Sequence, residues 1–322
     1  MRDRPGKSDP LADHRFLARV SWAYYVEGLT QEKIAAQMGS TRLRINKALA
    51  EAKRLGIVRI SIDTRHSQCF DLEARLTERF GLGRAHVTPE PLGDTDTQTM
   101  VGAALGHLLT DILRDPAVRR VGMGWGGTLN IAMRHVAPLA RPDVEVVSAM
   151  VGLVEGSETN CAEITARLAD LLGARRRYFP APLFAGSAAS RDAILEIDVF
   201  RTVLEGIRSC DVLVLATSDI SDRNLLIRSA LPGDITAEDL RAAGAVGDIL
   251  GTVIDAHGEP IDHAINRRVI GIGLDDLYAI PDVVLAGGGA HKVTVLRALL
   301  GRGFVDTLVT DAATARGILD MP

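Results

Sequence analysis

Residues 29–62 read LTQEKIAAQMGSTRLRINKALAEAKRLGIVRISI, and the pattern of this stretch decides the fold of the amino-terminal part of the chain. Thr30 has a side chain suited to an N-cap and precedes apolar residues at helical spacing, while Gly39 supplies the left-handed residue that ends a helix. Ser40 or Thr41 then caps a second helix. Two helices joined by a short turn that contains glycine predict a helix-turn-helix motif.

The second helix of this motif has an apolar stripe on one face, and its other face is mostly cationic and amide. We expect these residues to face the core: Leu43, Ile45, Ala48, Leu49, Ala52 and Leu55. After Gly56 the period changes from helical to alternating, which predicts a short wing strand that extends to Ile62. We expect DNA contacts from these residues of the motif: Thr30, Gln31, Thr41, Arg42, Arg44, Asn46 and Lys47.

The charge of the chain is unevenly distributed. Residues 1–65 contain 13 Lys and Arg against 7 Asp and Glu, a charge of +6, which leaves −10 for the remainder of a chain whose total is −4. A basic module attracts the phosphates of DNA, whereas an acidic body does not adhere to them. The charge therefore favours nucleic-acid binding, although paired amphipathic helices with a glycine turn also occur in proteins that never bind nucleic acid.

Length and composition are those of an ordinary globular chain, with 322 residues of which 47 % are hydrophobic and 24 % charged. No apolar run approaches the roughly 18 residues of a membrane helix. Residues 1–13 are charged and contain proline, which predicts a flexible tail rather than a signal peptide, so we expect a cytoplasmic protein. The three cysteines are far apart and the eight histidines are dispersed, so we expect no disulfide, no metal site and no cofactor.

From residue 70 onward, helical and strand patterns alternate, which predicts a Rossmann-like, mainly parallel α/β domain. One predicted strand ends at Val121 and is followed by glycines at 122, 124, 126 and 127 before a helix begins near Leu129. The backbone amides of such a turn bind anions. Because Gly122-x-Gly124-x-x-Gly127 also satisfies the dinucleotide fingerprint, a nucleotide site, a sugar-phosphate site and a purely structural turn remain three interpretations of this loop.

A second glycine loop follows the predicted strand at 283–286. Gly287, Gly288 and Gly289 precede Lys292, the only lysine after residue 53. In a domain that otherwise uses arginine, a lysine placed just after a glycine loop indicates a phosphate partner.

Two further polar residues lie near predicted turns. Asn160 precedes a predicted helix and is first of all an N-cap. Asp248 lies in a small-residue turn at 244–251, where it is either a turn residue or an acceptor for sugar hydroxyls. Asp248 and His291 are the candidates for a catalytic base, and no nucleophile with its base is recognisable, so we expect binding without turnover.

The motifs, taken in their order and spacing, resemble those of SorC-type sugar-sensing transcriptional regulators. The resemblance covers about Trp22 to Leu319 and rests on LTQEKIAAQMG and GIVRI near the amino end, then GMGWGGTL at 122–129, GAVGDILG at 244–251, RVIGIGLDDL at 268–277 and AGGGAHK at 286–292. It implies a winged helix-turn-helix, a domain similar to sugar-phosphate isomerases, a phosphorylated sugar as effector, and a dimer or tetramer. It also implies that Asn160 and Asp248 face the effector's hydroxyls. Residues 217–219 depart from the GIG usual in the family.

These observations predict four segments: a flexible tail at 1–13, a winged helix-turn-helix DNA-binding domain at 14–63, a linker at 64–69, and an effector-binding and oligomerisation domain at 70–322. The expected fold class is α/β, with a small all-α amino-terminal domain before the larger, mainly parallel one. We expect effector contacts from these residues: Gly124, Gly126, Gly127, Thr128, Asn160, Asp248, Gly288, Gly289 and Lys292.

The expected function is that of a DNA-binding transcriptional regulator of a carbohydrate or polyol catabolic operon. Its partners would be double-stranded operator DNA, a phosphorylated sugar or polyol effector, and further copies of the chain, with no membrane. The alternative is a sugar-phosphate isomerase-like or NAD-dependent enzyme that uses the glycine loops to bind a phosphate ligand.

Overall fold

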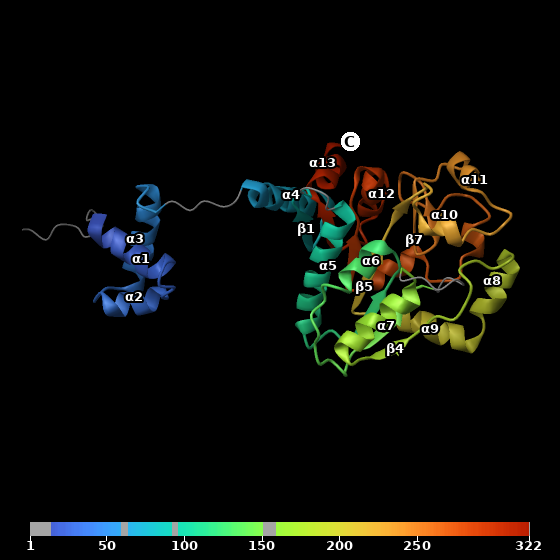
Figure 1. Ribbon diagram of the computed structural model, residues 1–322, viewed down its shortest axis with the longest axis horizontal. Helices are drawn as coiled ribbons and strands as arrows, with labels where there is room; N and C mark the ends of the chain where they lie inside the picture. Colours follow the sequence, from blue (N-terminus) through green and yellow to red (C-terminus); the bar gives the residue numbers. More distant parts are fainter. Residues whose placement is uncertain (1–13, 59–63, 92–95, 151–158, 322) are drawn as a thin grey trace, which may run out of the picture. The chain divides into compact units, whose positions relative to one another are not determined.

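The computed structural model describes residues 14–58, 64–91, 96–150 and 159–321, and the chain divides into two compact units, Met1–Asp63 and Thr64–Pro322. Figure 1 shows both units, with labels on many of their helices and strands. Together they form a mixed α/β fold with amino-terminal helices, which confirms the expected fold class. None of the helices in the described ranges combines the length and the apolar character needed to span a bilayer.

The described part of the first unit is helical. Its elements are α1 (His14–Tyr25), α2 (Gln31–Gln37) and α3 (Arg42–Arg54). Thr30 caps α2 and Thr41 caps α3, because each hydroxyl accepts a hydrogen bond from an amide three residues later at 3.3 Å. Gly39, in the turn between the two helices, has a φ of 58°. These local preferences produce the predicted helix-turn-helix arrangement.

One side of α3 packs against α1 and α2, and this side differs in part from the predicted apolar stripe. Ile45, Ala48, Leu49 and Ala52 are buried, but the Leu43 side chain is 66 % exposed and Leu55 is 40 % exposed. The prediction for Leu43 was wrong because a residue two positions before Ile45 lies about 200° around the helix. Leu55 is the C-cap residue and therefore lies beyond the last full turn.

The predicted wing strand falls mostly outside the described residues, which end at position 58 and resume at 64. Ile57 and Val58 form a bend rather than a strand, and both are partly buried against the core of the three helices.

The second unit is built on a seven-stranded sheet with the order β1-β10-β9-β5-β2-β3-β4, in which every pair of neighbours is parallel. Its strands are β1 (Arg84–Thr88), β2 (Arg120–Met123), β3 (Glu145–Ser148), β4 (Arg175–Arg177), β5 (Val212–Ala216), β9 (Asp282–Ala286) and β10 (Thr307–Asp311). Alternate residues of the central strands point to opposite faces of the sheet, so both faces are apolar and both are covered by helices.

Two groups of helices cover the two faces, as their buried residues show. On one face lie α5 (Thr97–Arg114), α6 (Gly127–Ala132) and α7 (Cys161–Leu172). On the other face lie α4 (Thr64–Phe80), α9 (Asp198–Arg208), α12 (Val293–Arg302) and α13 (Ala312–Asp320). The remaining helices are α8 (Ala188–Leu195), α10 (Leu225–Ser229), α11 (Ala237–Ala242) and the 3-10 turns η1 (Asn266–Arg268), η2 (Leu274–Ala279) and η3 (Ala290–Lys292).

A second, three-stranded antiparallel sheet lies beside the first. It contains β6 (Ser218–Asp219), β7 (Gly247–Ile249) and β8 (Thr252–Ile254). Residues 244–251 were expected to form only a small-residue turn, but Asp248 lies within β7 and pairs with Ser218. Strands of two or three residues are too short for an alternating pattern to be recognised in the sequence.

Helix α4 begins the second unit earlier than predicted. It starts at Thr64, so residues 64–69, expected as a linker, belong to the helix. At its other end, the Arg79 guanidinium donates to the carbonyl oxygens of Leu319 at 2.5 Å and Met321 at 2.6 Å. The first helix of the unit is thereby tied to the last residues of the chain.

Candidate functional site

A cavity of about 650 Å³ lies at the carboxyl ends of three neighbouring strands, β9, β5 and β2. This is the place where open parallel sheets bind ligands. Its walls come from the loops after these strands, from the start of α5 and from β7. The lining residues are Asp96, Thr97, Gln98, Trp125, Gly126, Gly127, Thr128, Ala216, Thr217, Ser218, Asp219, Asp222, Arg223, Asn224, Leu225, Arg228, Asp248, Gly288, Gly289, His291 and Lys292.

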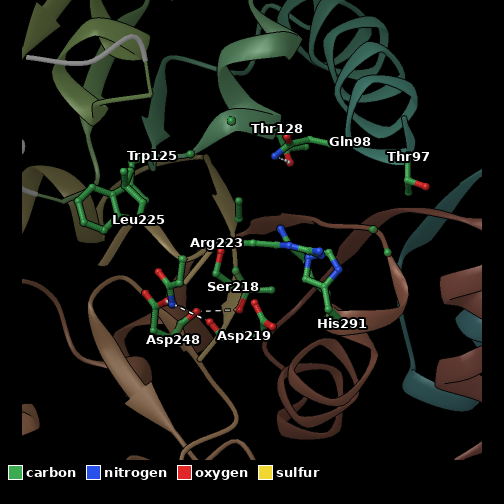
Figure 2. A pocket seen from close by; sticks show the side chains of 18 of the residues that line it. Thr97, Gln98, Trp125, Thr128, Ser218, Asp219, Arg223, Leu225, Asp248 and His291 are labelled. Carbon is green, nitrogen blue, oxygen red and sulfur yellow. Dashed lines mark hydrogen bonds between the residues drawn. The ribbon is translucent and has the colours of Figure 1, made fainter. Parts of the chain in front are cut away.

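The first glycine loop forms one wall. Gly126, Gly127 and Thr128 line the cavity, and the Thr128 hydroxyl accepts a hydrogen bond from Gln98 Nε2 at 3.4 Å. Figure 2 shows these two side chains together at the edge of the site. A Cβ atom on Gly127 would lie 2.8 Å from Gln98 Nε2, so the Gln98 side chain packs closely over this glycine.

Two predicted effector residues do not line the cavity, and the structure assigns them backbone roles. The Gly124 amide donates to the carbonyl of Val214 at 2.8 Å, which keeps Gly124 at the end of the sheet. Asn160 caps α7 by accepting a hydrogen bond from the amide of Ala162 at 3.2 Å. The N-cap expected at Asn160 is thus present, and the strand-end position of Gly124 was not foreseen.

The dinucleotide interpretation of this loop also fails on geometry. Gly122 lies inside strand β2, where an added Cβ atom would be 2.4 Å from Leu213 Cδ1. It is therefore a packing residue of the sheet and not the first glycine of a phosphate-binding turn.

The second glycine loop forms the opposite wall, but its amides are partly used by the protein itself. The Gly289 amide donates to Asp311 Oδ2 at 3.1 Å and to Thr314 Oγ1 at 2.7 Å. A Cβ atom on Gly288 would lie 2.6 Å from the same Asp311 oxygen and 2.8 Å from Thr97 Cγ2. The predicted convergence of glycine amides on a phosphate is therefore not available at Gly289, whose role is to fit the loop against α13.

Lys292 is the buried cation of the site. Its exposure is 8 %, and in the described residues no hydrogen bond or ion pair engages its ammonium group. Burial lowers the pKa of Lys292, and the nearby carboxylates of Asp219 and Asp248 oppose this shift. A buried ammonium that lines a cavity without such a partner is available for an anionic or hydroxyl-bearing ligand.

Asp248 is the buried carboxyl group of the site, with an exposure of 4 %. Its Oδ1 accepts a hydrogen bond from Asn224 Nδ2 at 2.8 Å, and its backbone carbonyl accepts one from the Thr217 hydroxyl at 2.7 Å. Burial raises the pKa of Asp248 to about 6, while the hydrogen bond from Asn224 and the charge of Lys292 act in the opposite direction.

Asn224 was not predicted, yet it organises this part of the site. Its Nδ2 donates to Asp248 Oδ1 and to the Asp219 carbonyl, both at 2.8 Å, while its Oδ1 caps α10 through the Leu226 amide. The segment that carries it follows β5, where the sequence departs from the family pattern. Asn224 stands immediately before an apolar helical run, which is the signal of an N-cap, but nothing in the sequence connects it with Asp248.

Other residues missed by the sequence analysis come from the same segment and from the start of α5. Arg223 is exposed, and in the described part of the chain its guanidinium has no hydrogen bond or ion pair. Figure 2 shows it directed toward His291, whose pKa is lowered by burial. Thr97 and Gln98 follow Asp96, whose side chain caps α5, so the sequence contains a signal for the helix but none for the cavity.

The predicted DNA-contacting residues lie around the starts of α2 and α3. The Gln31 amide donates to Asn46 Oδ1 at 3.5 Å, and Arg42 pairs with Glu32 at 3.3 Å, both on exposed surface. Lys47 is also exposed and lies in the second turn of α3.

Two of the predicted residues have structural roles in addition. Thr30 and Thr41 cap their helices. Arg44 is half-buried and lies 6.0 Å from the centroid of the Phe16 ring in α1.

No group of three or more His, Cys, Asp or Glu side chains in the described residues is arranged to hold a metal ion. The described residues that could contact a ligand are therefore hydrogen-bond donors and acceptors, charged side chains and backbone amides.

A family model described as "Putative sugar-binding domain" matches residues 64–320. Among curated proteins, the transcriptional regulator LsrR of Klebsiella pneumoniae subsp. pneumoniae is 31 % identical over 314 residues, which cover 96 % of this chain and 94 % of the relative. The erythritol catabolism regulatory protein EryD of Brucella abortus is 28 % identical over 317 residues, covering 97 % and 98 %. Both relatives are named as regulators, which supports the prediction that the chain is not an enzyme.

Solved structures have the same fold. The full-length sorbitol operon regulator SorC of Klebsiella pneumoniae matches with a TM-score of 0.71 and 24 % identity, covering 96 % of this chain and 99 % of that one. A DeoR family transcriptional regulator from Listeria monocytogenes matches with a TM-score of 0.68 and 24 % identity, covering 78 % and 99 %.

Proposed function

The chain belongs to the SorC-type family of sugar-binding transcriptional regulators, and from this premise we propose that it controls a carbohydrate or polyol catabolic operon in response to a phosphorylated sugar or polyol. In this proposal the first unit binds double-stranded operator DNA and the cavity of the second unit binds the effector. The observation that carries the proposal is that one cavity is lined by a buried ammonium, which has no hydrogen bond or ion pair in the described residues, and by a buried carboxyl group.

Lys292 and Asp248 offer two different kinds of recognition. An ammonium and the exposed Arg223 guanidinium suit the oxygens of a phosphate, which accept charge-assisted hydrogen bonds. The Asp248 carboxylate, held by Asn224, suits hydroxyl groups that need an acceptor. Thr128 and Gln98 add a hydroxyl and an amide on the opposite wall. A ligand with one anionic end and several hydroxyls matches this set.

The names of the relatives narrow the candidates for the effector. One relative regulates erythritol catabolism and a structural neighbour regulates a sorbitol operon, so short polyols and their phosphates are the first compounds to test. A volume of about 650 Å³ leaves room for such ligands together with ordered water.

Regulation requires that effector binding change the affinity for DNA. A coupling free energy of about 1 to 3 kcal/mol would change operator affinity by roughly 5- to 150-fold. We propose that the chain acts as a dimer or tetramer, because two recognition helices about 34 Å apart are needed to meet two half-sites of a duplex. An effector that alters the arrangement of the copies would then alter that spacing.

The test combines calorimetric titration with filter retention of operator DNA. A phosphorylated sugar or polyol should bind the full-length chain and change its DNA retention. Lys292→Met should weaken this binding by about 10- to 150-fold, the value of a lost charged hydrogen bond, and leave DNA binding without effector unchanged. Arg201→Met, an exposed cation of α9 outside the cavity, serves as the matched control and should change neither.

Each part of the proposal fails on a different result. Equal binding of phosphorylated and free polyols by the wild type and by Lys292→Met would remove the phosphate from the proposal. Failure of the wild type to retain any duplex at low ionic strength would remove DNA binding.

A further inference from the structure

Leu43 is an apolar side chain on the outer face of α3, the second helix of the helix-turn-helix. At 66 % exposure it is the most exposed of the large hydrophobic residues in the described chain. The buried residues Ile45 and Leu49 lie on the other side of α3, whereas Lys47, one turn after Leu43, shares its face. The face that points away from the core therefore has leucine in its first turn and lysine in its second.

The neighbours of Leu43 are polar and are held in place from α2. Arg42 is paired with Glu32 at 3.3 Å, and the Asn46 side chain accepts a hydrogen bond from Gln31 at 3.5 Å. An isolated apolar side chain among cations and amides is unlike the contiguous apolar patch of a protein interface. The charge around it, in a segment that carries +6, is complementary to nucleic acid.

We propose that Leu43 recognises thymine in the operator by packing against its C5 methyl group. This inference rests on the proposed DNA-binding function. In a helix-turn-helix, residues of the first turns of the recognition helix face base edges in the major groove. Thymine is the base that presents a methyl group there, and apolar side chains are its usual contacts. Leu43 is the exposed large apolar side chain in these turns of α3.

The experiment removes the methyl group and nothing else. A preferred duplex is first selected from a random double-stranded pool with the full-length chain, and each thymine is then replaced in turn by deoxyuridine, which pairs identically with adenine. With the wild-type chain, replacement at the contacted thymine should weaken binding by about fourfold, as expected for the loss of one buried methyl group. Replacements elsewhere should have no effect.

The variant Leu43→Ala should bind the thymine and deoxyuridine duplexes with equal affinity, because the side chain that distinguishes them is absent. Leu55→Ala is the matched control, since Leu55 is an exposed leucine at the other end of the same helix. It should retain the full fourfold difference. Such a double-mutant cycle isolates the contact from any general weakening of DNA binding.

Three results would overturn the inference, and they differ from a failure of the proposed function. Equal affinity of the wild type for all deoxyuridine duplexes would show that no thymine methyl group is recognised. A difference that persists in Leu43→Ala would assign the recognition to another residue, and a difference lost in both leucine variants would show that it does not depend on Leu43 specifically. Selection that enriches no duplex would instead contradict DNA binding itself.

Discussion

Replacement of Asp248 by asparagine tests whether this buried carboxyl group lowers the stability of the fold and contributes to effector binding. Asp248 is 4 % exposed, and burial raises its pKa from 3.8 to about 6. The folded chain thus keeps this proton to a higher pH than the unfolded chain does. The free energy of unfolding of the wild type should consequently fall as the pH rises through the interval between these values, and stay at the lower level above it.

The magnitude follows from the same two values. The difference between 3.8 and about 6 corresponds to about 3 kcal/mol at neutral pH. Asp248→Asn removes this cost, so without effector the variant should melt above the wild type at pH 8, by at most about 6 to 12 °C for a domain of this size. The value already includes the attraction of the Lys292 ammonium, which lowers the pKa of Asp248, and it is an upper bound because the amide nitrogen of the new side chain must also find a hydrogen-bond partner.

The assay is thermal unfolding across pH 4 to about 8, with and without effector. Near pH 4 the two proteins should converge, because Asp248 is then protonated in the folded wild type. The effector should bind Asp248→Asn about 10- to 150-fold more weakly at pH 8, since an ionised acceptor has been lost. Asp222→Asn, at an exposed position on the same cavity, should shift the melting temperature by no more than about 2 °C. A variant that melts at or below the wild type at every pH would refute this account of Asp248.

Three further predictions concern single contacts. Lys47→Ala should weaken operator binding and reduce the slope of log K against log salt by about 1 per removed phosphate contact. The control is Lys53→Ala, which should leave the slope unchanged because the Lys53 ammonium lies 5.7 Å from the centroid of the Tyr25 ring. Equal slopes for the wild type and both variants would contradict a phosphate contact by Lys47. Gly288→Ala places a Cβ atom 2.6 Å from Asp311 Oδ2 and should lower the free energy of unfolding by about 1 to 3 kcal/mol in a denaturant titration. Gly186→Ala, where the Cβ position is open, should leave this free energy unchanged. Similar denaturation midpoints for the two variants would contradict the close approach at Gly288. Thr41→Ala should cost about 1 kcal/mol of local stability, seen as faster hydrogen exchange in α3, and Thr41→Ser should restore most of it.

Much of the fold could be predicted because its signals are local. The caps Thr30, Thr41 and Asp96 each stand directly before a helical apolar pattern, and strand β5 is a continuous apolar run. Leu43 shows the limit of this method. Its apolar character suggested the core, but its angular position on α3 places it outside.

The site could be predicted only where a glycine loop follows a strand. Seven of the expected effector residues line the cavity: Gly126, Gly127, Thr128, Asp248, Gly288, Gly289 and Lys292. The others on its walls, such as Gln98 and Asn224, reach it because the strand order brings separate segments together. That order is set by pairing between distant parts of the chain, which periodicity within a short window does not reveal.

The pairing of the first and last strands affects how the molecule is made. Arg84 in β1 donates a hydrogen bond to Thr307 in β10, 223 residues later, and α4 is held by carbonyl groups at the carboxyl end of α13. During synthesis, β1 and α4 therefore cannot complete these contacts until β10 and α13 have been made, whereas α1, α2 and α3 have all their described helical partners much earlier. A nascent chain would complete the helices of the proposed DNA-binding unit well before the proposed effector-binding unit.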